Sequence, residues 1–252
     1  MSDLESSTTI RDYIYTVLDA NKNWAQRLNQ TFPQYFPDPE DKQAPKILWI
    51  GCSDSRVQES DATTALPGNV FVHRNIANQF HLHDDSALSV FAYAVKVLGT
   101  RHVVVVGHEH CGGAITALKE ARRPPSADQL ERHHTLYDSL YHLVETFHIN
   151  EIHDKDSNDP NDAITRWLTP LVHRIRKLEL PAEEGTAVRI VIEENVKLQI
   201  EKIVQLGDWV RRNVREPDGR PATVWVHGWV YDFATGFIRD LNVTRELGGG
   251  SE

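Results

Sequence analysis

Two short strings of the sequence carry the side chains best suited to chemistry: Cys52-Ser-Asp-Ser-Arg56 and His108-Glu-His-Cys111. Zinc is bound by thiolate and imidazole, and a catalytic zinc site has three protein ligands with a fourth position left open. Cys52, His108 and Cys111 supply such a set, and the two-residue gap between His108 and Cys111 suits a tight metal-binding turn. Because the sequence has only two cysteines, a closed structural site would lack a third sulfur ligand. The strings therefore predict a catalytic zinc site.

These ligands lie far apart in the sequence, so the fold must bring them together. Apolar runs predict buried strands at 46–51, 69–75 and 102–107, and two more strands at 223–231 and 237–243 around a turn. Apolar residues at helical spacing predict helices at 10–29, 84–98, 112–121, 161–178 and 187–215, with a further helix near 128–148. This alternation favours an α/β fold with a mostly parallel sheet flanked by helices and an antiparallel edge strand. Ligand sites in such sheets lie beyond the carboxyl ends of strands where the strand order reverses, and Cys52 and His108 each follow a strand.

The sequence is predicted to hold one main domain. Its 252 residues suit a single large core. Residues 1–45 are expected to form an N-terminal helical arm, and residues 46–247 a single α/β domain. Within that domain, the charged segment 122–160 predicts a mobile insertion, and the glycine-rich tail 248–252 is expected to be disordered.

Composition and charge exclude several classes of protein. A hydrophobic fraction of 40% and a charged fraction of 25% are ordinary for a globular protein and exclude wholesale disorder. A net charge of −9 without a basic block argues against nucleic acid or an anionic membrane as a partner. The apolar runs are too short to span a bilayer. The first ten residues contain Asp3 and Glu5 and lack the apolar stretch of a signal peptide, so we expect a cytoplasmic protein.

A family resemblance rests on CSDSR followed by HxxC, with PGNVFVHRNIAN between them and WVHGWVYD later in the sequence. These motifs, over residues 45–120 and 187–243, resemble the β-class carbonic anhydrases. The resemblance implies a sheet of four parallel strands and an antiparallel fifth, one Zn²⁺ per chain on Cys52, His108 and Cys111, and an Asp54–Arg56 dyad. It also implies the reaction: a zinc-bound hydroxide attacks CO2 to give bicarbonate and a proton.

The ligand set and the dyad lead to two expectations about regulation. Two thiolates cancel the metal charge, so the bound water should be less acidic than on three imidazoles and activity should rise toward alkaline pH. Asp54 can remain ionised beside Arg56, or leave it and become a fourth zinc ligand that closes the site. In relatives with this closed state, a bicarbonate pocket matches Trp49, Arg74 and Tyr231, which predicts switching by bicarbonate and pH.

Each of the additional residues also has a plain structural interpretation. Trp49 could be a core aromatic, Arg74 the partner of an acid, and Tyr231 a residue at the edge of a turn. Gly112 and Gly113 are consistent with close helix packing, although a backbone N–H at Gly112 could also hold a substrate oxygen. The sequence alone leaves these alternatives open.

One other pair of histidines precedes a predicted helix. His81 and His83 lie just before Asp84 and Asp85. We interpret them as part of a solvated loop, with a second metal site as the alternative.

Several rival functions share some of these features. A zinc oxidoreductase would require a dinucleotide site, and the sequence has no G-x-G-x-x-G motif. A non-catalytic zinc or bicarbonate sensor would not require the Asp54–Arg56 dyad. Cys52 and Cys111 could instead form a redox switch, and a hydrolase of carbonyl sulfide or carbon disulfide would keep every ligand. The resemblance further implies a homodimer or a homotetramer, with residues 10–29 lying over the partner, although this amphipathic segment could equally pack on its own domain.

Overall fold

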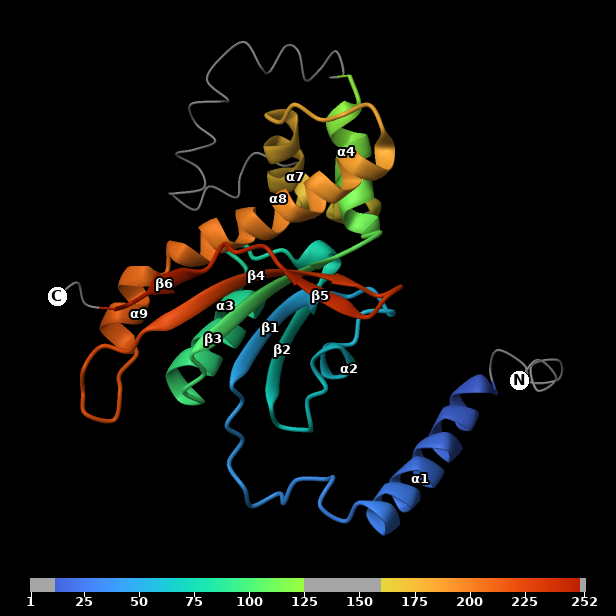
Figure 1. Ribbon diagram of the computed structural model, residues 1–252, viewed down its shortest axis with the longest axis vertical. Helices are drawn as coiled ribbons and strands as arrows, with labels where there is room; N and C mark the ends of the chain where they lie inside the picture. The colour runs from blue at the N-terminus through green and yellow to red at the C-terminus, as the bar shows by residue number, and fades with distance from the viewer. Residues whose placement is uncertain (1–11, 125–159, 250–252) are drawn as a thin grey trace. The chain divides into compact units, whose positions relative to one another are not determined.

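The computed structural model describes residues 12–124 and 160–249 (Figure 1). The chain divides into two compact units, one of residues 1–43 with 66–68 and one of residues 44–65 with 69–252. None of the helices in the described part of the chain is long and apolar enough to cross a membrane. The predicted helix at 128–148, most of the predicted insertion at 122–160 and the last three residues of the tail lie outside the described residues.

The first unit is built around α1 (Tyr13–Thr31), which confirms the helix predicted at 10–29. The helix ends where the Phe32 N–H bonds to the Leu28 carbonyl, one residue before Pro33. Within the helix, Trp24 contacts the rings of Tyr35 and Phe36, which follow α1, edge-on with centroids 6.0 and 5.4 Å away. By contrast, several apolar side chains of α1 are more than half exposed: Tyr13, Ile14, Tyr15 and Leu18.

The second unit is organised by a twisted sheet. Its strands are β1 (Ile47–Cys52), β2 (Val70–Asn75), β3 (His102–His108), β4 (Val224–Asp232), β5 (Phe237–Asp240) and β6 (Arg245–Leu247). The order is β2-β1-β3-β4-β5, with the first four strands parallel and β5 antiparallel. The chain reverses its direction of winding between β1 and β3, which are neighbours. The predicted fold class and the predicted switch point are therefore confirmed.

The sixth strand was not predicted, and β5 is shorter than expected. The predicted strand at 237–243 ends at Asp240, whose carboxylate accepts a hydrogen bond from the Asn242 N–H at 2.8 Å. Asn242 takes a left-handed backbone with φ 56°, so the chain turns there. β6 then pairs antiparallel with the first half of β4, beside β5 on the same edge.

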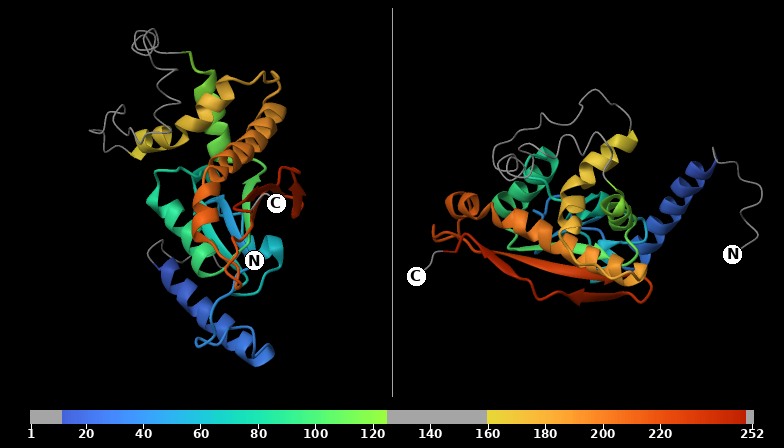
Figure 2. Two further views of the ribbon diagram at one scale, coloured as in Figure 1. Left: turned by 90° about the vertical axis from the view of Figure 1, so that its left-hand side faces the viewer. Right: turned by 90° about the horizontal axis from the view of Figure 1, so that it is seen from above.

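Most helices of this unit cover one face of the sheet, as Figure 2 shows for α8, whereas α2 packs beside β2 on the opposite face. Their bounds are α2 (Glu59–Thr63), α3 (Asp85–Ala92), α4 (Gly112–Arg122), α7 (Pro160–Arg176), α8 (Glu184–Val204) and α9 (Gly207–Asn213). The helix predicted at 84–98 begins as expected, because the Asp84 carboxylate caps the Ser86 N–H at 2.9 Å. Its last part, Tyr93–Val97, is a π-helical turn. The single helix predicted at 187–215 is two helices separated at Gln205 and Leu206.

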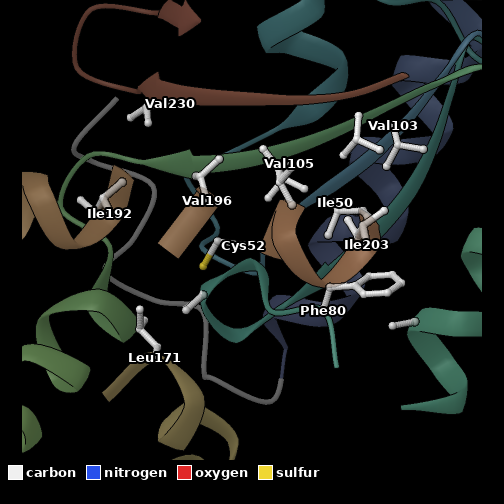
Figure 3. Close-up of a cluster of buried hydrophobic side chains, with 14 of the residues drawn as sticks. Ile50, Cys52, Phe80, Val103, Val105, Leu171, Ile192, Val196, Ile203 and Val230 are labelled. Carbon is white, nitrogen blue, oxygen red and sulfur yellow. The ribbon is translucent and has the colours of Figure 1, made fainter. Parts of the chain in front are cut away.

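Alternating strand residues divide the core into two clusters. Leu48, Ile50 and Cys52 of β1 face the helices, in the cluster drawn in Figure 3. Trp49, between them, points to the opposite face and packs with Val104 and others. Cys52 thus lies at the carboxyl end of a buried strand, within the core that α8 covers.

Candidate metal centre

Cys52 is the last residue of β1 and is 5% exposed. Its backbone is fixed from the neighbouring strand: the Arg74 Nε donates to the Cys52 carbonyl at 2.9 Å, and the Ser53 N–H donates to the Asn75 carbonyl. The Cys52 sulfur accepts hydrogen bonds from the backbone N–H groups of Asp54 and Ala77. Those donors stabilise a thiolate at this position.

His108 is the last residue of β3 and is fully buried. Its Nδ1 lies 2.9 Å from the Glu109 carbonyl oxygen, which can only accept, so Nδ1 carries the proton. The Nε2 atom is buried and has no hydrogen-bond partner. A buried nitrogen lone pair that accepts no hydrogen bond costs free energy of folding unless it binds something else, such as a metal ion. This tautomer is the one that a metal-binding histidine adopts.

Cys111 immediately precedes α4 and is 1% exposed. The backbone N–H groups of Gly113 and Ala114, at the start of that helix, bond to its sulfur. The ligand turn is tight, since His110 has a left-handed φ of 56°. These backbone donors at the N-terminus of α4 favour the thiolate form of Cys111.

The three predicted ligands converge. One ligand atom of each of Cys52, His108 and Cys111 lies within 4.8 Å of the others, and all three residues are buried. The hydrogen bond from the Cys111 thiol is the main cause that lowers the pKa of Cys52 to about 4, against the opposing effect of burial. The same hydrogen bond and burial raise the pKa of Cys111 well above its ordinary value. Two sulfurs and an unpartnered imidazole nitrogen form a donor set that fits zinc.

Comparison with known proteins identifies the family. Residues 47–238 match the family model described as carbonic anhydrase. The chain belongs to the carbonic anhydrase family. A carbonic anhydrase of Emericella nidulans is 30% identical over 233 residues, covering 90% of this chain and 82% of the relative.

Solved structures place the chain in the β class of carbonic anhydrases. The β-carbonic anhydrase CafA of Aspergillus fumigatus is 31% identical with a TM-score of 0.63, covering 92% of this chain and 91% of that one. One structure from a study of two tetrameric β-carbonic anhydrases of Sordaria macrospora is 28% identical with a TM-score of 0.61, covering 93% and 99%. The predicted family and enzyme class, a lyase that hydrates CO2, are therefore confirmed.

The predicted dyad of this carbonic anhydrase is formed beside the ligand cluster. Asp54 and Arg56 make a two-pronged ion pair, with Oδ1–Nε at 2.9 Å and Oδ2–Nη2 at 2.7 Å. This pairing holds the pKa of Asp54 well below its usual range. The Asp54 Oδ2 lies 4.0 Å from the His108 Nε2. The Arg56 guanidinium also stacks on the Phe233 ring, 4.1 Å from its centroid, a contact that the sequence did not indicate.

The residues predicted for a bicarbonate pocket share one face of the sheet. Trp49 is fully buried and packs as a core aromatic in the cluster that Tyr231 joins. Its indole Nε1 is nevertheless buried without a hydrogen-bond partner. Arg74 does pair with an acid, Glu59, at 3.5 Å, but its Nε and Nη2 also bond to the Cys52 and Asp54 carbonyls.

The two glycines after Cys111 have different roles. A Cβ on Gly113 would approach the Ala77 Cβ at 2.7 Å, so this glycine allows close packing of α4. A Cβ on Gly112 would meet nothing within 4 Å, and Gly112 is exposed. The packing explanation thus holds for Gly113, whereas Gly112 has open space beside it.

Sequence reasoning missed the polar groups behind the site. Ala77 and Asn78 have left-handed backbones with φ of 59° and 47°, a conformation that asparagine tolerates but that costs about 1–2 kcal/mol at Ala77. The Asn195 and Gln79 side chains bond to the Ala77 carbonyl inside the core. On α8, Asn195 occupies a position that helical spacing assigns to the buried face, and this polar exception was the available signal.

The solvated-loop interpretation of His81 and His83 is wrong for His81. That ring is 4% exposed, stacks with His83 and meets the Trp167 ring edge-on at 4.4 Å. Burial, followed by the nearby charge of Lys202, lowers the pKa of His81 to about 3. Neither histidine joins a cluster of metal-binding side chains among the described residues.

Proposed function

We propose that this carbonic anhydrase catalyses the reversible hydration of CO2 to bicarbonate and a proton, with one zinc ion held by Cys52, His108 and Cys111. The observation that carries the proposal is the buried His108 Nε2, which has no partner and lies among two cysteine sulfurs. Zinc bound there would acidify a coordinated water and so supply the nucleophile at moderate pH.

The other residues act on the reacting molecules. Asp54, kept ionised by Arg56, can only accept a hydrogen bond, so it orients the attacking oxygen with a lone pair toward CO2. We propose that the backbone N–H of Gly112, an exposed residue at the start of α4, holds a substrate oxygen. A non-catalytic sensor would not require this arrangement of Asp54 and Arg56.

The rate of CO2 hydration by the zinc-loaded protein should rise from mildly acidic to alkaline pH. The two thiolate charges of Cys52 and Cys111 oppose loss of a proton from solvent at the site, so the productive state forms only at higher pH. Asp54 does not cause this dependence, because its lowered pKa keeps it ionised over the whole range. Stopped-flow CO2 hydration in a series of buffers measures the profile. A flat profile contradicts this charge argument, and faster turnover of carbonyl sulfide or carbon disulfide contradicts CO2 as the main substrate.

We also propose that bicarbonate binds beside Trp49, Arg74 and Tyr231 and favours a closed state with Asp54 on the metal. The support is the unpartnered Trp49 Nε1 and the cation of Arg74 on the same face of the sheet. Arg74 also contacts the Asp54 carbonyl, which links this face to the dyad.

Replacing Trp49 by phenylalanine should weaken inhibition by bicarbonate and shift the pH at which activity is lost. The reason is that the ring remains apolar while the indole N–H, the available donor, is removed. Initial rates measured against bicarbonate concentration at several pH values test this, with Tyr231→Phe as a second variant. If both variants respond to bicarbonate and pH as the wild type does, the pocket does not exist.

The assembly is proposed to be a homodimer or a homotetramer. The support is the exposed apolar side chains of α1 and the tetrameric relatives from Sordaria macrospora. Light scattering coupled to size exclusion should give at least twice the 28.7 kDa mass of one chain. A fully active monomer contradicts this proposal. The cytoplasmic location stays a prediction from the sequence.

A further inference from the structure

A buried network of side-chain amides connects α8 to the turn Ile76–Asn78, which follows β2. Asn195, Gln199 and Gln79 are each at most 2% exposed. The Asn195 Oδ1 accepts from the Gln79 Nε2 at 2.7 Å and from the Gln199 Nε2 at 2.8 Å. The Asn195 Nδ2 donates to the Ala77 carbonyl at 2.9 Å and to the Asn78 Oδ1 at 3.3 Å. All four hydrogen-bonding positions of the Asn195 amide are therefore used.

The turn that this network holds is under backbone strain. Ala77 has φ 59° and ψ 33°, and neither Ala77 nor Asn78 is a glycine. Two amide donors converge on the Ala77 carbonyl, from Asn195 at 2.9 Å and from Gln79 at 2.8 Å. Asn75 closes the turn from outside, because its amide bonds to both the N–H and the carbonyl of Gln79, each at 2.7 Å.

The same turn lies against Cys52 and against the start of α4, which follows Cys111. The Ala77 N–H bonds to the Cys52 sulfur. The Ala77 Cβ packs where a side chain on Gly113 would lie, two residues after Cys111. The network, the strained turn and the two sulfurs thus form a continuous path of contacts.

We propose that Asn195 and Gln79 are positioning residues, which hold the Ile76–Asn78 turn so that the Ala77 N–H faces the Cys52 sulfur before a metal binds. This inference rests on the proposed metal site. Neither side chain touches the reacting molecules. Their effect reaches the site through Ala77, whose left-handed backbone relaxes when its carbonyl loses its donors. A hydrogen bond to a ligand sulfur tunes both its orientation and its strength as a ligand.

Asn195→Leu and Gln79→Met test the proposal, because each keeps the size of the side chain and removes the donors to Ala77. The measurements are the rate of zinc release to a chromogenic chelator and the thiolate-to-metal charge-transfer absorption of the cobalt-substituted protein. We expect each variant to release zinc about 10-fold faster, the lower end of the effect of an outer-sphere partner. We also expect a shifted charge-transfer band, which a loss of overall stability would not produce.

The control is Val191→Ala, also in the buried face of α8 and outside the network, which destabilises the fold without freeing Ala77. It should release zinc at the wild-type rate with an unchanged cobalt spectrum. Folded Asn195 and Gln79 variants that behave like this control overturn the proposal. A wild-type chain that binds no zinc instead overturns the proposed function, so the two failures are distinguishable.

The unmodified chain supplies a second measurement in case neither variant folds. In the metal-free protein, the Ala77 amide hydrogen should exchange slowly with deuterium. The reason is that the turn is already formed and its N–H already protected before the metal binds. Exchange of the Ala77 amide at the rate of an exposed loop contradicts the proposal.

Discussion

Replacing Cys111 by serine should abolish zinc binding at stoichiometric concentration and, with it, CO2 hydration. Serine keeps the position at the start of α4 but its hydroxyl does not ionise near neutral pH, so one anionic ligand is lost. Mutation of a residue that only supports a metal ligand lowers metal affinity by up to roughly 100-fold. Because Cys111 is a proposed ligand itself, we expect zinc affinity to fall by more than that. Metal analysis after gel filtration and stopped-flow CO2 hydration measure the two effects.

Lys119→Ala on the same helix is the control for Cys111→Ser. Lys119 is exposed on α4 and touches none of the ligands, so its removal should leave zinc content and rate unchanged. Circular dichroism of both variants shows whether the fold persists. A folded Cys111→Ser protein that keeps one zinc and the wild-type rate contradicts the assignment of Cys111 as a ligand.

Replacing Asp54 by asparagine should lower kcat/KM for CO2 by about 100-fold or more while zinc content stays at one per chain. The amide has nearly the shape of the carboxylate, but it loses the negative charge and presents a donor where an acceptor is required. The two-pronged pair with Arg56 is lost as well. Stopped-flow kinetics together with metal analysis separate the effect on rate from an effect on binding.

The chain contains a matched control for this substitution. Asp218 and Arg220 have the same spacing as Asp54 and Arg56, with Oδ2–Nε at 2.7 Å and the Arg220 N–H on Oδ1 at 3.1 Å. This pair also lowers the pKa of its aspartate but is exposed and lies away from the ligands. Asp218→Asn should leave kcat/KM unchanged. An Asp54→Asn variant with the same rate as Asp218→Asn removes Asp54 from the mechanism.

The sequence could predict that Cys52, His108 and Cys111 cluster, because residues of ligand type stand at the ends of predicted strands. Cys52 and His108 each end an apolar run, and parallel strands bring such ends to one edge of the sheet. The short gap from His108 to Cys111 then keeps Cys111 close to the other two residues. Local signals were equally sufficient for the start of α3, where Asp84 caps the helix.

The network behind the metal centre could not be predicted because its members are polar residues in contact across long sequence separations. Gln79 meets Asn195 116 positions away, and their local hydrogen bonds, from Gln79 to the Ala77 carbonyl and from Gln199 to Asn195, do not reveal that both side chains are buried. The same holds for His81, which a neighbouring ring and Trp167 cover. β6 could not be predicted for a related reason. Its three residues are too few to show an alternating pattern, and the strand is defined by its pairing with β4.

X-ray absorption at the zinc edge, on protein purified under reducing conditions, tests the central claim most directly. We expect one zinc per chain with two sulfur neighbours at about 2.3 Å and nitrogen or oxygen neighbours at about 2.0–2.1 Å. That shell would correspond to Cys52, Cys111 and His108 with an open position. Protein that contains no zinc, or a zinc shell without sulfur, would contradict the account.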